Sequence, residues 1–250
     1  MRRFLAAIRF LTILPVPGPL GTAEADLAGS VPFFPIVGLL IGAVAAAAAY
    51  GLSLCAPPLI SAAAIVVLLT GVGGGLHADG LADTADGLLS HRPRERALEI
   101  MKDSRTGAMG VLAIVCVLGT KFAALASIAP WNLWAAALLM PLAGRCAMVV
   151  HMALLPYVRA EGLATVFYKR RPRYSAVWAV AVLAGASGAM FGLKGLVLAA
   201  ICLAVTLVLA GWCYRRIGGA TGDTFGAACE IVETVPALVV AMWPLQAARW

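Results

Sequence analysis

Three aspartates lie within eight residues of a chain that otherwise carries few charges. The stretch Gly73–Leu89 reads GGGLHADGLADTADGLL and contains Asp79, Asp83 and Asp86. Steps of four and then three residues place the three carboxylates on one face of a helix. Because carboxylates so close repel one another, and their oxygens suit Mg²⁺ or Ca²⁺, the spacing favours a divalent-cation site. The alternative, a solvated acidic helix end, fits poorly between two long apolar segments.

Further polar residues surround this stretch in the sequence. His77 precedes the aspartates and suggests a base, a substrate contact or an ordinary interfacial histidine. Lys102 and Arg105 follow in KDSRTG, where they would be well placed to bind phosphate oxygens. Glu99 and Asp103 share a predicted mixed-charge helix with Lys102, which ordinary pairing four residues apart explains in part. Carboxylates, a divalent cation and nearby cations are typical of phosphoryl transfer.

A second glycine-rich segment, GGATGD, ends in Thr221, Gly222 and Asp223. Backbone N–H groups there, before a helix start, could bind a phosphate. This signal is weak alone and gains weight from its predicted place on the same membrane side as the aspartates. In another loop, Arg159 and Glu161 are further site candidates.

Two charges, Lys121 and Arg145, fall inside predicted membrane spans. Ionisable residues within a membrane are costly and by default suggest a functional site. We expect a polar cavity, open to the cytoplasm, to hold both with the aspartates at its mouth. Snorkelling of the side chain to a membrane face is the alternative, more plausible for Lys121 than for Arg145.

Composition defines the fold class that must position these residues. Of 250 residues, 62% are hydrophobic and 12% charged, with mean hydropathy +0.93, far from a soluble domain. The sequence predicts one integral membrane domain over 1–250, an all-α polytopic helical bundle. About seven transmembrane helices are expected, at 31–54, 57–76, 107–128, 131–152, 175–192, 195–212 and 234–248.

The charges gather on one side of this predicted topology. The N-terminus and the loops 77–106, 153–174 and 213–233 hold fifteen of the 19 Lys and Arg residues and all 12 acidic ones. The bias of Lys and Arg assigns that side to the cytoplasm, and these three loops are the candidate catalytic loops. A nucleic-acid partner is therefore not needed to explain the net charge of +7.

The first residues, MRRFLAAIRFLTIL, begin like a signal peptide, but Arg9 interrupts the apolar run and Pro15 follows it. We expect an amphipathic helix lying in the membrane interface. The six cysteines are scattered, with no CxxC or zinc-like spacing, and indicate small core residues rather than disulfides.

Seven segments, in order along nearly the whole chain, resemble the cobalamin synthase family, also called the adenosylcobinamide-GDP ribazoletransferases. They are VPFFPIVGLLIG at 31–42, GGLHADGLADTADGLL at 74–89, RERALEIMKDSRTGAMG at 94–110, KFAAL at 121–125, GRCAMV at 144–149, PYVRAEGL at 156–163 and GGATGDTFGAACE at 218–230. The pair at 74–89 and 94–110 is the most specific.

The resemblance implies a Mg²⁺-dependent membrane enzyme. It would join adenosylcobinamide-GDP and α-ribazole, or its 5'-phosphate, to give adenosylcobalamin, or its 5'-phosphate, and GMP. The ribazole 3'-hydroxyl would attack the phosphorus attached to the cobinamide side chain. Association with other late cobalamin-pathway enzymes is a further expectation from the family.

The candidate residues take roles in that chemistry. The expected Mg²⁺ ligands are Asp79, Asp83 and Asp86, completed by Asp103 and Asp223. Lys102 and Arg105 would bind the diphosphate, and one carboxylate or His77 would accept the hydroxyl proton. The expected substrate contacts are Lys121, Arg145, Arg159, Gly222, Thr221 and Glu99.

Other classes remain to be weighed. A CDP-alcohol phosphotransferase also uses helical aspartates, but Asp83 follows Asp79-Gly80 too soon for its motif. A prenyltransferase would want a second aspartate-rich pair, where 213–233 offers one Asp and two Glu. A transporter would predict an inverted repeat and broken helices near mid-membrane, and no such pairing is visible.

Overall fold

The computed structural model describes residues 1–159, 162, 164–168 and 173–243. Glu161 and the end of the last predicted span, 244–248, lie outside the described residues. The α-helices are α1 Arg2–Leu11, α2 Glu24–Ala28, α3 Phe34–Cys55, α4 Pro58–Val72, α5 Leu76–Leu88, α6 Arg94–Ile100, α7 Ala108–Ser127, α8 Pro130–Leu154, α9 Thr165–Tyr168, α10 Arg173–Phe191, α11 Leu193–Ile217 and α12 Gly222–Met242. A 3₁₀ turn, η1 Val31–Phe33, precedes α3.

The predicted helical membrane bundle is confirmed. Within the described part of the chain, six helices are long and apolar enough to cross a membrane, namely α3 with η1, α7, α8, α10, α11 and α12. The pair α4 and α5 forms a seventh candidate that is bent by 88°. Two glycines between them, Gly74 and Gly75, have positive φ angles of 60° and 74°, which residues other than glycine rarely adopt.

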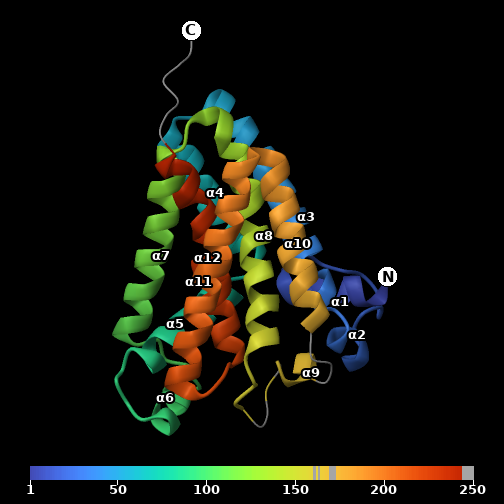
Figure 1. Ribbon diagram of the computed structural model, residues 1–250, viewed down its shortest axis with the longest axis vertical. Coiled ribbons are helices and arrows are strands. Elements are labelled where there is room, and N and C mark those ends of the chain that lie inside the picture. The colour runs from blue at the N-terminus through green and yellow to red at the C-terminus, as the bar shows by residue number, and fades with distance from the viewer. Residues whose placement is uncertain (160–161, 163, 169–172, 244–250) are drawn as a thin grey trace.

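Helix α8 runs through the middle of the bundle, with α3 and α10 beside it on one side and α7, α11 and α12 on the other (Figure 1). Close packing against α3 depends on small residues, since a Cβ on Gly38 would lie 2.9 Å from the Pro141 carbonyl oxygen. The tight joins after α3, α7 and α10 lie at one end, whereas α5, α6 and α9 lie toward the other (Figure 1).

The predicted start of the last span was wrong. We expected a polar loop over 213–233, but α11 continues to Ile217 and α12 already begins at Gly222. Thr221 and Thr224 form a capping box that starts α12 at this point. Glu230 and Glu233 therefore lie inside a membrane-spanning helix, where buried cations neutralise them, as described below.

The N-terminal segment forms the expected amphipathic helix. In α1, Ala6, Ala7 and Leu11 are buried, while Arg2 and Arg3 are exposed. The helix packs beside the start of α3 through aromatic rings, including a stacked pair of Phe10 and Phe34 with centroids 5.8 Å apart. Arg2 and Arg3 thus remain on the outer face, as an interfacial helix requires, whereas Arg9 is part-buried and donates to the Val16 carbonyl oxygen.

Candidate functional site

The aspartates occupy one face of α5, as their spacing predicted. Leu81, Ala85 and Leu88 are buried on the rest of the helix, whereas Asp79 is exposed and Asp83 is half-buried. Neither of these two carboxylates has a hydrogen-bond or ion-pair partner among the described residues. They are the acidic side chains of α5 that are available to a ligand.

Asp86 has a different environment. It accepts hydrogen bonds from the backbone N–H groups of Gly107, at 2.6 Å, and Gly110, at 2.8 Å. These N–H groups belong to the start of α7, where no intrahelical acceptor exists. A Cβ on Gly110 would lie 2.5 Å from a carboxylate oxygen of Asp86, so glycine permits the contact. Both oxygens of Asp86 therefore cap α7.

Helix α12 crosses α5 very closely beside the aspartates. A Cβ on Gly80 would lie 2.8 Å from the carbonyl oxygen of Asp223, and one on Gly226 would lie 3.0 Å from that of His77. The crossing sets Asp223 against the aspartate face, and its negative charge acts on Asp83 together with that of Asp79. Two glycines thus bring sequence segments about 140 residues apart into one site.

Arg159 reaches the same place from the loop after α8. Its guanidinium donates to Asp223 at 2.6 Å and to the Met101 carbonyl oxygen at 3.1 Å. A short parallel bridge fixes this loop, because the Val158 N–H donates to the Ala220 carbonyl oxygen and the Ala220 N–H donates to that of Pro156. Arg159 and Asp223, which the sequence analysis named separately as a substrate contact and a metal ligand, thus lie in direct contact.

A cavity of about 170 Å³ lies where these elements meet. Its polar side chains are those of His77, Asp79, Tyr157, Arg159 and Asp223, and Gly222 also lines it. His77 is buried, and its Nε2 atom has no hydrogen-bond partner among the described residues. The cavity combines acceptors, a guanidinium and an imidazole, which is suitable for binding an anion and handling a proton.

Tyr157 could not be identified as a site residue from the sequence, because a single tyrosine in a loop gives no pattern. Burial raises the pKa of its hydroxyl, although the charge of Arg159 opposes this. The hydroxyl therefore remains a hydrogen-bond donor at neutral pH. It also explains why residue 162 is glycine, since a Cβ there would lie 2.8 Å from the Tyr157 hydroxyl oxygen.

The segment between α6 and α7 carries exposed charges. Lys102 is exposed, and Glu99 pairs with Arg96 on the same helix at 2.7 Å. Arg105 donates to both carboxylate oxygens of Asp103, at 3.0 and 2.6 Å, and this pairing lowers the Asp103 pKa to about 2. The segment with Lys102, Asp103 and Arg105 is linked to α5 by the hydrogen bond from the Gly107 N–H to Asp86. Neither these residues nor Glu99 line the cavity.

Lys121 and Arg145 do not line the predicted polar cavity. Both are 1% exposed. Lys121 donates to Glu230 at 2.6 Å and to Glu233 at 2.9 Å, while Arg145 donates to Glu233. Two cations from α7 and α8 thus neutralise two carboxylates of α12, which makes the charges tolerable inside a membrane helix.

The donor set of the site suits a divalent cation without forming a complete shell. Among the described residues, no three His, Cys, Asp or Glu side chains gather as a metal-binding group. Asp79 and Asp83 supply unpartnered hard oxygens one helical turn apart, and Asp223 faces them. This set fits Mg²⁺, which commonly takes one or two protein carboxylates and fills its remaining positions with water and substrate phosphates.

Comparisons with known proteins point to one family. The family model described as cobalamin-5-phosphate synthase matches residues 3–241. An adenosylcobinamide-GDP ribazoletransferase of Roseiflexus sp. is 44% identical over 92% of this chain and 85% of its own length. Those of Desulforamulus reducens and Pseudomonas putida are 41% and 39% identical, over 91% and 97% of this chain and 91% and 99% of theirs. No solved structure matches.

Proposed function

The chain belongs to the cobalamin-5-phosphate synthase family, and we propose that it joins adenosylcobinamide-GDP to α-ribazole or α-ribazole 5'-phosphate with release of GMP. The chain is thus a transferase of cobalamin biosynthesis that acts in nucleotide-loop assembly. The observation that carries the finer proposal is the cavity, where Asp79 of α5, Arg159 of the 155–164 loop and Asp223 of α12 meet.

Binding of the diphosphate is assigned to cations at the cavity and its rim. Arg159 would turn from Asp223 to phosphate oxygens, for which a guanidinium is well shaped. Lys102 and Arg105 would approach from the exposed segment before α7. Gly222 at the start of α12 lines the same cavity, and its backbone N–H would add a neutral donor.

Asp79 and Asp83, with Asp223 opposite, would hold Mg²⁺. The ion would supply positive charge against the diphosphate and the departing GMP. In the transfer, a new bond forms between the ribazole 3'-oxygen and phosphorus while the bond from phosphorus to the GMP oxygen breaks. The hydroxyl proton passes to a base, for which the site offers the unpartnered Nε2 of His77 or the Asp79 carboxylate.

The surroundings follow from the distribution of charge. We place the end of the bundle with α5, α6 and α9 in the cytoplasm of a bacterial cell, and the bundle in the inner membrane, because that end carries most Lys and Arg. Access from the cytoplasm suits water-soluble nucleotide substrates. Association with other enzymes of late cobalamin assembly is part of the same proposal.

The test is product formation by purified protein in lipid. Adenosylcobinamide-GDP, α-ribazole 5'-phosphate and Mg²⁺ should give equal amounts of GMP and a cobalamin 5'-phosphate, and EDTA should stop both. Parallel reactions with α-ribazole alone, a CDP-alcohol and a prenyl diphosphate define the substrate. Well-folded protein that releases no GMP, or that turns over a CDP-alcohol instead, would overturn the proposal.

A further inference from the structure

A second cavity lies on the opposite side of α5 from the aspartates. It measures about 170 Å³ and is enclosed by α5, α7, α8, α11 and α12. Its walls are mainly apolar and include Leu81, Leu209, Trp212 and Ile231. Both α7 and α11 are long and apolar enough to cross a membrane, so the cavity lies among candidate membrane-spanning helices.

Two buried polar groups in this cavity have no partner. The side chain of His151 is 0% exposed, and neither ring nitrogen has a hydrogen-bond partner among the described residues. The hydroxyl of Thr84 is also buried without a partner in the described chain. Both residues line the cavity. Most buried polar atoms are hydrogen-bonded, so two unpartnered groups at one cavity indicate that something else binds them.

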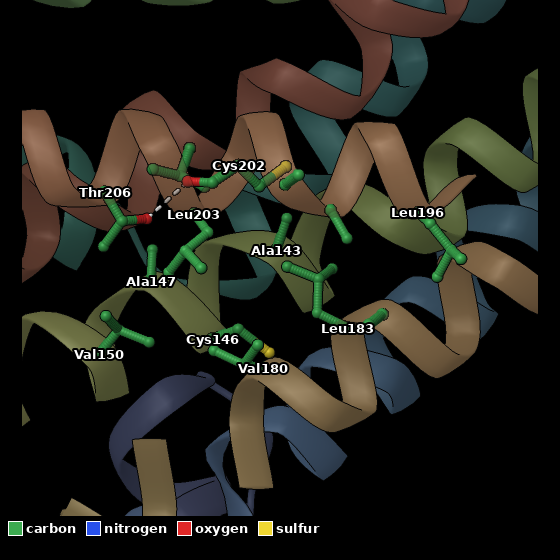
Figure 2. A pocket seen from close by; sticks show the side chains of 14 residues that line it. Ala143, Cys146, Ala147, Val150, Val180, Leu183, Leu196, Cys202, Leu203 and Thr206 are labelled. Atoms are coloured by element: carbon green, nitrogen blue, oxygen red, sulfur yellow. Dashed lines mark hydrogen bonds between the residues drawn. The ribbon is translucent and has the colours of Figure 1, made fainter. Parts of the chain in front are cut away.

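A third cavity has no such unpartnered nitrogen or oxygen atom among its described lining residues. It measures about 220 Å³ and lies between α8, α10 and α11 (Figure 2). Thr206 on its wall donates to the Cys202 carbonyl oxygen at 2.8 Å, as the dashed line in Figure 2 shows, and Cys146 donates to that of Ala179. Its polar lining atoms are satisfied within the protein, so lipid chains alone can fill it. Unpartnered polar atoms thus distinguish the cavity at His151 from the cavity of Figure 2, and it shares them with the cavity at the aspartates, where Nε2 of His77 is unpartnered.

We infer that the His151 cavity binds a small uncharged aromatic heterocycle, which hydrogen-bonds to His151 and Thr84. A cavity of about 150 Å³ accepts a benzene ring, so this one has room for a small ring system. An imidazole surrounded by apolar side chains is uncharged, and it presents one N–H donor and one nitrogen acceptor. A heteroaromatic ring matches both the apolar walls and these two groups. This site is separate from the proposed phosphoryl transfer.

The binding test uses the full chain in phosphatidylcholine nanodiscs, with ¹⁵N in its three histidines. Indazole, which has one N–H and one bare ring nitrogen, is titrated against its carbon analogue indene. We expect indazole to shift the ring signals of His151 saturably and to leave those of His77 and His91 in place. After correction for partition into lipid, indazole should bind about ten-fold more tightly than indene.

Three variants make the result specific. His151→Phe should remove the preference for indazole over indene. Ala113→Phe, at a half-exposed lining position, should block the cavity and abolish the shift, whereas Ala200→Phe in the cavity of Figure 2 should not. Thermal unfolding verifies that each variant is folded. No saturable shift at His151, an equal effect of both blocking variants, or a shift confined to His77 would overturn the inference.

Discussion

Asp86 accepts two backbone hydrogen bonds from α7, whereas Asp79 and Asp83 accept none from the described residues. By spacing alone the three aspartates are equivalent, but their contacts in the fold indicate different roles. Asp86 fixes the start of α7 and so the position of the segment that carries Lys102 and Arg105. Asp79 and Asp83 remain for the proposed cation. At the residue scale, structural and chemical roles are thus adjacent on one helix.

Replacement of Asp86 by Ala should therefore affect stability. Loss of a capping carboxylate costs about 1–2 kcal/mol, because two N–H groups of α7 would lose their acceptor. Thermal unfolding in detergent should show a lower midpoint for Asp86→Ala and an unchanged or higher one for Asp83→Asn. An unchanged midpoint in Asp86→Ala would show that the cap does not stabilise α7.

The ion pair of Asp103 and Arg105 predicts a pH effect. The folded pKa of Asp103, about 2, lies below the unfolded value of about 3.8. Its contribution to stability is therefore present above pH 3.8 and is lost as the pH falls through about 2. Carboxyl ¹³C NMR should show Asp103 titrating near 2 in the wild type and closer to 3.8 in Arg105→Ala. Equal titration in both proteins would contradict the pairing.

At the element scale, α12 contributes residues both to the cavity and to the buried ion network. Its first turn carries Asp223 into the cavity, and its middle carries Glu230 and Glu233 into an ion network with α7 and α8. Glu233 binds Lys121 and Arg145 at once. The network fixes α12 against the central helix, which in turn sets the close crossing with α5. Lys121 and Arg145 thus support the site from a distance.

Removal of one charge from this network should be more harmful than removal of a pair. Lys121→Met leaves the buried carboxylates of Glu230 and Glu233 with Arg145 as their one cation. We expect the free energy of unfolding to fall by about 3–5 kcal/mol. The double variant Lys121→Met/Glu230→Gln leaves the neutral pair of Arg145 and Glu233 and should recover much of the stability. Unfolding midpoints of the single and double variants measure this coupling. Additive losses would argue that the charges do not interact.

The sequence predicted most spans because long apolar runs identify them directly, as in α3, α7 and α8. It misplaced the start of α12 because Glu230 and Glu233 lower local hydropathy, and their partners Lys121 and Arg145 lie about 90 to 110 residues away. The same distance explains why these two cations were expected in a polar cavity. Local pattern found the aspartates, whereas Tyr157 and the cap at Asp86 depend on tertiary contacts.

At the scale of the whole molecule, the residues of the proposed transfer site lie toward one end of the bundle. The tight joins lie at the opposite end from α5, α6 and α9 (Figure 1), and α5 lines the cavity. The membrane-spanning helices act as a frame that aligns three distant segments. Such an arrangement would keep polar reactants out of the bilayer, and the buried charges of α7, α8 and the middle of α12 neutralise one another.

The most direct measurement compares initial rates of GMP release from adenosylcobinamide-GDP by Asp79→Asn, Asp83→Asn and a matched control, Glu95→Gln. Glu95 is exposed on α6 and lies outside the cavity, so its replacement removes one charge from the same end. The account predicts that both aspartate variants stay folded and lose activity by about 100-fold or more, and that the control keeps wild-type rates. Wild-type, Mg²⁺-dependent rates in both aspartate variants would contradict the central claim that α5 and α12 form the transfer site.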